Sequence, residues 1–433
     1  MFRRCSSKIY DSIKTISAGF CTMSEKIPIR KPRYDGRSKK RKWEERRTDQ
    51  GEAFDVKREK TEDRVKKRKY AILLGYSGSN YFGMQRNVFT KTIEEDLFKA
   101  LLDSKHINEE AFKHPQTVQF QRAARTDKGV SAARQVVSIK LPEMLDIEKI
   151  NNNLPEVIRI FGYKRVTKGF NSKSSCDART YFYMLPTITF SDKEETSLKD
   201  FRLSKSTFEK VNELLQKYIG TKNYHNFTSK RLSNDPSCNR YILSFICEEP
   251  IIRNDIEFAV LKVKGQSFIL HQIRKMIGLT IAVIRGYTTE ESFTRAFSKE
   301  KINIPRAPGL GLVLDFVHYD RYNARYGEDG MHETLEWKEL DETVDQFKEK
   351  YIYPTIINTE INENNMITWL EKLSTHSFDL TEDDQRGDNE EDEGDENSDE
   401  KRDDLEESLG VDNMDDSLKD KIERDDKNVV VNS

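Results

Sequence analysis

The chain has 433 residues, enough for one large domain or for two to three ordinary ones. Its net charge is −2, but residues 382–427 hold 23 acidic and 7 basic side chains, a local charge of −16, so the remainder carries +14. A basic body with an acidic tail favours a polyanionic partner, most simply a nucleic acid. The five cysteines form no C-x-x-C pair, which argues against a zinc cluster and for a reducing compartment. The longest apolar run, residues 276–284, is too short for a membrane span, so we expect a soluble protein.

The first 22 residues have the composition of a targeting segment. They carry four basic side chains against one acid, are rich in serine and lack the apolar core of a secretory signal. This pattern indicates a mitochondrial presequence, and a disordered N-terminus is the alternative that the sequence leaves open. Met23 follows directly, so a second start codon would give a form without the presequence and a route to two compartments.

A basic arm is predicted over residues 23–68. Its clusters, residues 39–42 and 66–69, are typical of nuclear import signals or RNA-contacting arms, with a solvated disordered linker as the alternative. Hydrophobic periodicity begins only at Tyr70, where we expect the folded body to start. The two segments together predict a nuclear protein with a mitochondrial form.

Strands and amphipathic helices alternate through the folded body. Capping-box patterns at Thr92–Glu95 and Ser206–Glu209 predict two helices, the second ending before Gly220. Strand-like runs occupy residues 70–76, 117–121, 135–139, 157–163, 181–185, 241–247, 257–263 and 312–318. This order predicts an α+β or α/β body.

The pattern weakens beyond Phe347, although residues 364–373 can form one more helix. After Asp379 the chain is acidic and nearly free of aromatic residues, so we expect a disordered tail. The tail is either a solubilising segment or an electrostatic competitor of RNA for the basic body.

The most informative stretch is Arg-Thr-Asp-Lys-Gly-Val-Ser-Ala, residues 125–132, between two strand-like runs. An isolated Asp-x-Gly sequence is usually a tight turn. The whole string, however, resembles the catalytic signature of the TruA-type pseudouridine synthases.

Further stretches resemble the same family in the same order: residues 75–85, 178–183, 220–228, 268–278 and 307–312. The first is Gly-rich and carries Met84 where bacterial members usually have tryptophan. Glycine would let this loop pass close to an RNA backbone, and a plain hairpin turn is the alternative. The resemblance covers about residues 68–325, and the extensions on both sides are those of eukaryotic members.

The resemblance implies an α+β pseudouridine synthase fold. Two α/β subdomains, residues 69–200 and 201–347, would share a mixed, mainly antiparallel sheet with a central basic cleft, followed by a helical extension over residues 348–379. The implied activity is isomerisation of uridine to pseudouridine in tRNA, with mRNA and small nuclear RNA as further targets. The chemistry needs no cofactor or metal, and the chain contains no G-x-x-x-x-G-K-[ST] loop of a P-loop enzyme.

Three residues take roles from the resemblance, and a fourth, Arg125, takes its role from its position on the same side of an extended segment as Asp127. Asp127 is the catalytic carboxylate, acting as nucleophile or base, and Arg274 forms an ion pair that keeps it charged. Tyr181 is the platform for the uracil ring, with a packed strand residue as the alternative reading. Arg125, two residues before Asp127, helps to hold the flipped nucleotide. His271 lacks partners for a metal and is read as structural or RNA-facing.

Two rival functions use the same composition without catalysis. One is an RNA-binding protein or chaperone on the same fold, and the other is a nuclear scaffold that binds partners through its charged tails. An intact Asp127 motif with Tyr181 and Arg274 favours the enzyme. The sequence does not decide between a monomer and a homodimer.

Overall fold

The computed structural model describes residues 66–87, 89–191, 197–229, 231–327 and 329–379. The predicted presequence, nearly all of the basic arm and the acidic tail lie outside these residues, and what was expected of them stays a prediction. Within the described part of the chain, no helix combines the length and the apolar character that a membrane crossing requires.

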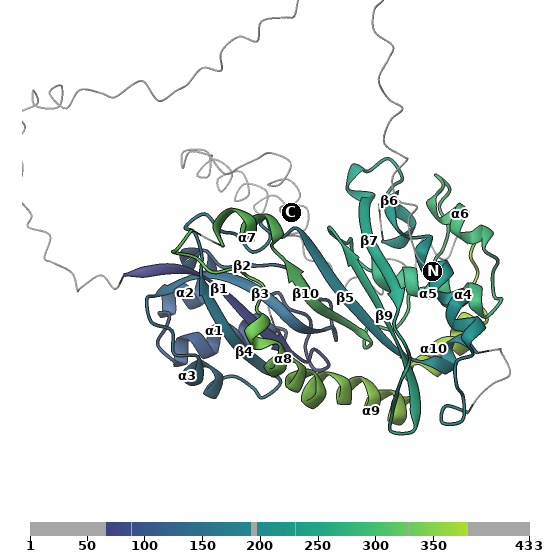
Figure 1. Cartoon of the computed structure of the whole chain (residues 1–433), viewed down its shortest axis with the longest axis horizontal. Coiled ribbons are helices and arrows are strands. Elements are labelled where there is room, and N and C mark those ends of the chain that lie inside the picture. The colour runs from purple at the N-terminus through teal and green to yellow at the C-terminus, as the bar shows by residue number, and fades with distance from the viewer. Residues whose placement is uncertain (1–65, 88, 192–196, 230, 328, 380–433) are drawn as a thin grey trace, which may run out of the picture. The chain divides into compact units, whose positions relative to one another are not determined.

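One mixed sheet runs through the described residues (Figure 1). Its main strand order is β4-β1-β3-β10-β5-β9-β7-β6, while β2 pairs with β3 and β8 with β9. All pairs are antiparallel except β3 with β10. The strands are β1 Lys67–Tyr76, β2 Gln121–Arg122, β3 Ser131–Pro142, β4 Ile158–Arg165, β5 Ala178–Pro186, β6 Gly220–Asn223, β7 Asn239–Cys247, β8 Ile251–Arg253, β9 Ile256–Gly265 and β10 Leu312–His318. The predicted mixed, mainly antiparallel α+β architecture is confirmed.

The last strand in the sequence lies at the centre of the sheet. β10 pairs with β3 on one side and with β5 on the other. β5, placed by the sequence in the first subdomain, pairs with both β9 and β10 of the second. In the structure, strands from both sides of residue 200 share one sheet. The subdomain boundary predicted at residue 200 stays a prediction.

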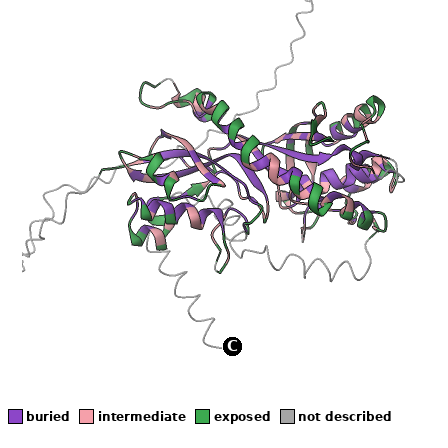
Figure 2. Cartoon of the chain, turned by 90° about the horizontal axis from the view of Figure 1, so that it is seen from below, coloured by how far each residue is buried: buried purple, intermediate pink, exposed green. Residues whose placement is uncertain are grey.

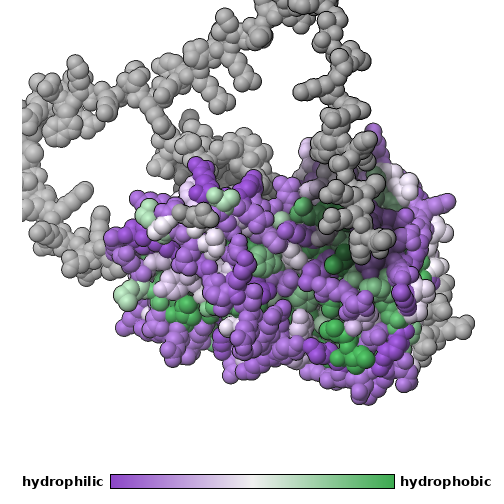
Figure 3. Space-filling model, viewed as in Figure 1, coloured by the Kyte–Doolittle hydropathy of each residue, from purple (hydrophilic) through white to green (hydrophobic). Residues whose placement is uncertain are grey.

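Two groups of helices accompany the two ends of the sheet (Figure 1). Helices α1 (Ile93–Asp103), α2 (Glu109–Lys113) and α3 (Ile147–Asn152) lie with β1, β3 and β4, whereas α4 (Lys205–Gln216), α5 (Gln272–Ile284) and α6 (Glu291–Phe297) lie with β7 and β9. Figure 2 shows the sheet buried and the outer helix faces exposed. Most of the face in Figure 3 is hydrophilic, and its hydrophobic side chains form separate patches, several of them in the right-hand half. Short 3-10 helices span Pro115–Val118, Thr187–Phe190, His225–Phe227, Pro236–Cys238 and Lys338–Leu340.

The strand predictions hold where apolar and β-branched residues are continuous. The predicted strand 70–76 lies within β1, where every residue from Tyr70 to Tyr76 is a buried hydrophobic residue or glycine. The runs at 135–139, 157–163, 181–185, 241–247, 257–263 and 312–318 coincide with β3, β4, β5, β7, β9 and β10 to within one residue at the edges or lie inside them.

The helix starts are only partly as predicted. Thr92 caps α1 by accepting from the amide of Glu95 at 3.3 Å, but the Glu95 carboxylate pairs with Arg86 instead of reaching back. The cap of α4 is Ser204, which accepts from the amide of Thr207, so the start predicted at Ser206 is wrong by two residues. Ser206 fits the capping-box pattern because Glu209 lies three residues later, whereas Ser204 is followed at that spacing by Thr207.

The strand predicted at residues 117–121 is wrong. Pro115 starts a 3-10 helix, and the Thr117 hydroxyl donates to the carbonyl of His114 at 2.8 Å. Such local side-chain bonding competes with a strand. Gln119 then turns the chain at φ 51°, which leaves only two residues for β2.

The chain after β10 is more helical than its sequence pattern predicts. It forms α7 (Asp320–Tyr326), α8 (Asp341–Phe347), a π-helical turn (Lys348–Ile352), α9 (Tyr353–Glu363) and α10 (Asn365–Leu373). The predicted helix over residues 364–373 is confirmed as α10, and α9 lies within the helical extension expected over residues 348–379 but was not predicted as a separate helix. α9 buries only a few apolar side chains, among them Ile356 and Ile357, so its periodicity is weak.

Candidate active site

Asp127 lies in the loop between β2 and β3, at the centre of the sheet. The parallel register pairs Ser131 of β3 with Val313 of β10, which brings the loop beside β10 and its neighbour β5. The amide of Val130 donates to the carbonyl of Asp127 at 3.1 Å, and Gly129 occupies the left-handed region at φ 78°. The Asp127 side chain is 26% exposed, so it is partly sheltered but reachable from solvent.

The Gly-rich motif packs directly against this loop. A Cβ on Gly78 would lie 2.1 Å from the carbonyl oxygen of Val130, and one on Gly83 would lie 2.7 Å from that of Thr126. The amide of Met84 donates to the Thr126 carbonyl at 3.0 Å. These glycines are therefore required by close contact between two protein backbones. The segment is not the plain hairpin considered from the sequence, because no strand lies between it and α1 among the residues that the structure describes.

Buried polar contacts hold the loop on its other side. Thr126 shares a 2.8 Å hydrogen bond with the hydroxyl of Tyr76, whose pKa is raised to about 12, chiefly by burial. The amide group of Gln135 pairs with the backbone of Ala124, accepting at 3.2 Å and donating at 2.7 Å. The loop is thus fixed before a substrate arrives.

Arg179 also braces this loop, a role that the sequence did not indicate. It donates from Nε and Nη2 to the carbonyl of Ala123 at 3.0 and 2.6 Å, and from Nη1 to that of Gln266 at 3.2 Å. Arg179 precedes Tyr181 by two residues on β5, within the family-like stretch of residues 178–183. A basic residue inside that motif was the feature of the sequence that could have indicated its role.

Tyr181 lies near Asp127 on β5. It is 7% exposed, and its ring meets that of Phe268 edge-on with centroids 5.3 Å apart. Burial raises the pKa of Tyr181 well above its usual range; Arg179 opposes the rise, and the nearby charges of Tyr76 and Asp127 add to it. The phenol is therefore neutral at physiological pH. Its role as a platform for uracil stays a prediction.

Arg274 lies on α5 and holds the turn that precedes β10. Its Nε donates to the carbonyl of Ala307 at 2.7 Å, and the amide of Ala307 donates back to the carbonyl of Arg274 at 3.2 Å. A Cβ on Gly309 would lie 3.6 Å from Cζ of Arg274 and 3.7 Å from the carbonyl oxygen of Lys128. The guanidinium is thus brought alongside the residue that follows Asp127. The predicted ion pair with Asp127 stays a prediction.

His271 lies next to Asp127 in the structure. The residue precedes α5 at φ 62° and is therefore not part of the helix that carries Arg274. Its side chain is fully buried, which leaves the structural reading and excludes the RNA-facing one in this conformation. Its Nδ1 lies 3.8 Å from Oδ2 of Asp127, and its Nε2 lies 2.8 Å from Nη1 of Arg306.

The proton on His271 can be assigned from its neighbours. Arginine only donates hydrogen bonds, so Nε2 accepts from Arg306 and the proton of the neutral ring belongs on Nδ1. The Nδ1–H group then faces the Asp127 carboxylate. Arg306 had no recognisable signal in the sequence.

Arg125 lies in the same loop, half-buried and two residues before Asp127. Its expected role in holding the flipped nucleotide stays a prediction. Among the described residues, no group of three histidine, cysteine or acidic side chains is arranged to hold a metal. Cys176, Cys238 and Cys247 are buried and free.

Comparison with known proteins identifies the class. The profile of the tRNA pseudouridine synthase family matches residues 214–320, which include α5 and β10. The chain is 52% identical to "Pseudouridylate synthase 1 homolog" of Mus musculus over 73% of its length and 76% of the relative, and 53% identical to the Homo sapiens protein of that name over 72% and 74%. It is 32% identical to "tRNA pseudouridine synthase 1" of Kluyveromyces lactis over 75% and 73%.

These matches show that the chain belongs to the tRNA pseudouridine synthase family. It is an enzyme, an isomerase that converts uridine into pseudouridine. Nothing in the comparisons favours the alternative of a non-catalytic RNA-binding protein.

Proposed function

We propose that this enzyme acts on uridines of tRNA and uses the Asp127 carboxylate as its reacting group. The observation that carries the proposal is the placement of Asp127 at the centre of the sheet, partly sheltered and held between β5 and α5. The family profile and the Kluyveromyces lactis relative carry tRNA in their names, which supports the substrate class.

The reaction is balanced without a co-reactant. The bond between N1 of uracil and C1′ of the ribose breaks, the base turns within the pocket, and C5 forms the new bond to C1′. C5 then loses its proton and N1 gains one. Asp127 starts the reaction by attacking C1′ or by taking a proton from C2′, and both routes need a charged carboxylate. The Nδ1–H group of His271 stabilises that charge.

The target base must leave its stack before it reaches Asp127, at a cost of roughly a few kcal/mol. Tyr181 offsets this cost by contact with the uracil ring, as a neutral and rigid side chain already packed against Phe268. Arg274 and Arg125 supply positive charge beside the same loop. In this arrangement the protein positions the base, and one carboxylate performs the chemistry.

The test compares Asp127→Ala and Asp127→Asn with Asp103→Asn, which changes an exposed carboxylate at the end of α1. Both Asp127 variants should lose pseudouridine formation on tRNA while their affinity for it stays within a few-fold. Asp103→Asn should retain wild-type turnover. Appreciable turnover by Asp127→Ala would overturn the assignment, and loss of RNA affinity in that variant would show that Asp127 serves binding.

We also propose that mRNA and small nuclear RNA are further substrates and that the enzyme works in the nucleus and, in a second form, in mitochondria. The basic clusters and the presequence-like segment of residues 1–22 support these proposals. Tagged chains starting at Met1 and at Met23 should differ in mitochondrial import, and identical distributions would remove the two-form hypothesis. Light scattering of the purified protein decides between monomer and homodimer.

A further inference from the structure

A basic cavity of about 430 Å³ opens beside the candidate active site. Its lining includes the cations Arg274, Lys275, Arg306 and Lys372, and none of the described residues that line it is acidic. Four cations without a carboxylate around one hollow make a strongly positive site, because charges in a concave surface reinforce one another. A cavity of this charge selects an anion.

The cavity adjoins Asp127 without containing it. Arg274 and Pro308 form part of its wall, and Pro308 accepts a 2.7 Å hydrogen bond from Tyr183, two residues after Tyr181 on β5. Arg306, another lining residue, donates to His271, which faces Asp127. An extended molecule whose reacting group lies at Asp127 can therefore continue into this cavity.

Hydrogen bonds to neutral groups help to fix the positions of three of these cations. Nε of Arg274 donates to the carbonyl of Ala307, Nζ of Lys275 to the carbonyl of Thr228 at 3.3 Å, and Nη1 of Arg306 to the imidazole of His271. These contacts orient the three side chains around the cavity.

Helix α10 supplies the opposite wall, with Trp369 and Lys372 on the face toward the cavity. It lies outside the stretch that the family profile matches, residues 214–320. Trp369 is half-buried and offers a flat apolar surface, and His376 lies beyond the end of the helix. Aromatic side chains next to cations are the usual means of holding single nucleotides, by stacking and by charge.

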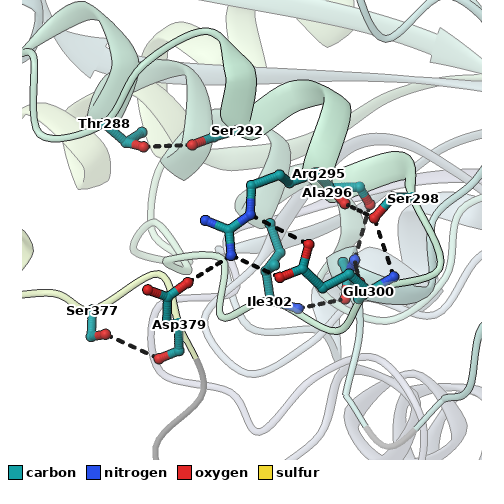
Figure 4. Close-up of polar contacts among 10 residues, drawn as sticks. Thr288, Ser292, Arg295, Ala296, Ser298, Glu300, Ile302, Ser377 and Asp379 are labelled. Atoms are coloured by element: carbon teal, nitrogen blue, oxygen red, sulfur yellow. Dashed lines mark hydrogen bonds and ion pairs between the residues drawn. The ribbon is translucent and has the colours of Figure 1, made fainter.

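The wall is anchored at its far end (Figure 4). Arg295 of α6 donates to the carboxylate of Asp379 at 2.6 Å and to that of Glu300 at 2.9 Å. The amide of Asn303 donates to the carbonyl of Phe378 at 3.0 Å. The segment that follows α10 is thus tied to the chain that forms the cavity floor, and α10 is held in place as a wall.

We propose that this cavity binds a nucleotide that flanks the target uridine in the RNA strand. Its phosphate is held by Arg306 and Lys372, and its base stacks on Trp369. The inference rests on the proposed function, since it assumes that the target base lies at Asp127. It assigns to the C-terminal extension a direct part in substrate binding.

The experiment compares Trp369→Ala and Lys372→Gln with Lys205→Gln, which removes an 89% exposed lysine at the start of α4. Trp369→Ala should raise KM for tRNA about 5- to 100-fold, as for the loss of one stacked base, with most of the loss in KM rather than kcat. Lys372→Gln should weaken binding and make the slope of log K against log salt shallower by about 0.7, as for one lost phosphate contact on a single strand. Lys205→Gln should change neither quantity.

Substrates with one abasic nucleotide identify the bound base. One substrate is abasic at the nucleotide 5′ of the target uridine and another at the nucleotide 3′ of it. For the substrate that lacks the base bound by the cavity, Trp369→Ala and wild type should give the same KM. If the Trp369→Ala penalty persists with either flank abasic, or if the variants bind tRNA like wild type, the subsite is disproved.

Dissociation constants measured in an Asp127→Ala background separate the two proposals. Binding there does not depend on catalysis, so a Trp369 effect on affinity supports the subsite whether or not Asp127 is the reacting group. Wild-type protein that binds tRNA but makes no pseudouridine would overturn the proposed function alone. Circular dichroism melting of each variant confirms that α10 still folds.

Discussion

The contact between His271 and Asp127 can be tested with a matched pair of substitutions. Asparagine places its amide nitrogen where Nδ1 of histidine lies and so keeps a donor toward Asp127. Glutamine reaches the position of Nε2, so it keeps an acceptor for Arg306 and loses the donor toward Asp127. If the donor is what matters, His271→Asn retains activity and His271→Gln does not.

The size of the effect follows from the geometry. A hydrogen bond to a charged group contributes about 1.5–3 kcal/mol. At 3.8 Å the two atoms are beyond hydrogen-bonding distance, so this range applies once the contact shortens in the substrate complex, as catalytic contacts often do, and we take its lower end. A loss of about 1.5 kcal/mol lowers kcat/KM by roughly 10-fold. We therefore expect about a 10-fold loss for His271→Gln and a loss of less than about 3-fold for His271→Asn.

The assay uses tRNA tritiated at C5 of uridine, because C5 loses its hydrogen when it bonds to C1′. His271 lies at φ 62°, which asparagine tolerates and glutamine adopts at a cost of about 1 kcal/mol, so rates are compared well below both melting temperatures. Equal losses in the two variants would refute the donor argument and leave His271 as a packing residue. Arg306→Gln should have a smaller effect in the same direction as His271→Gln, because without the Arg306 donor the ring proton of His271 is no longer held on Nδ1.

Three further outcomes are expected. Gly78→Ala forces a Cβ to within 2.1 Å of the Val130 carbonyl and should lower turnover more than 10-fold. Gly169→Ala, where a Cβ meets nothing within 4 Å, should leave activity unchanged. Similar activities of the two variants would show that the loop around Val130 can move to accept the Cβ. Tyr181→Phe keeps the stacking ring and should cost a few-fold, while Tyr181→Leu should cost about 100-fold; a large loss in Tyr181→Phe would assign a chemical role to the hydroxyl. Burial raises the pKa of Glu360 from 4.5 to about 7, so the folded state holds this proton more tightly than the unfolded one and stability falls as pH rises from about 4.5 to 7. Glu360→Gln should remove that fall, worth about 3 kcal/mol, in denaturation curves at pH 5 and 8; parallel pH dependence in variant and wild type would contradict it.

The strands and the site loop were predictable because their signals are local. A continuous apolar run marks β1, a largely alternating pattern marks β9, and the eight-residue string around Asp127 is specific in itself. The position of β10 was not predictable, since its pairing partners are more than 100 residues away in the sequence.

Parts of the site escaped prediction for the same reason. The Arg306 contact joins a loop to a histidine 35 residues earlier, and the brace from Arg179 to Ala123 spans 56 residues. Neither leaves a local pattern. His271 itself adopts a left-handed conformation directly before the first residue of α5, which the sequence pattern of residues 268–278 does not reveal.

The central place of β10 has a consequence for biosynthesis. Within the described sheet, β3 and β5 are joined only through this strand, and on the β3 side the register covers just two residue pairs. Until residue 318 has left the ribosome, each half of the sheet ends in an open edge, and open strand edges recruit foreign strands. Chains that stop before residue 312 should therefore accumulate as aggregates, and a nascent chain needs its own last strand to become soluble.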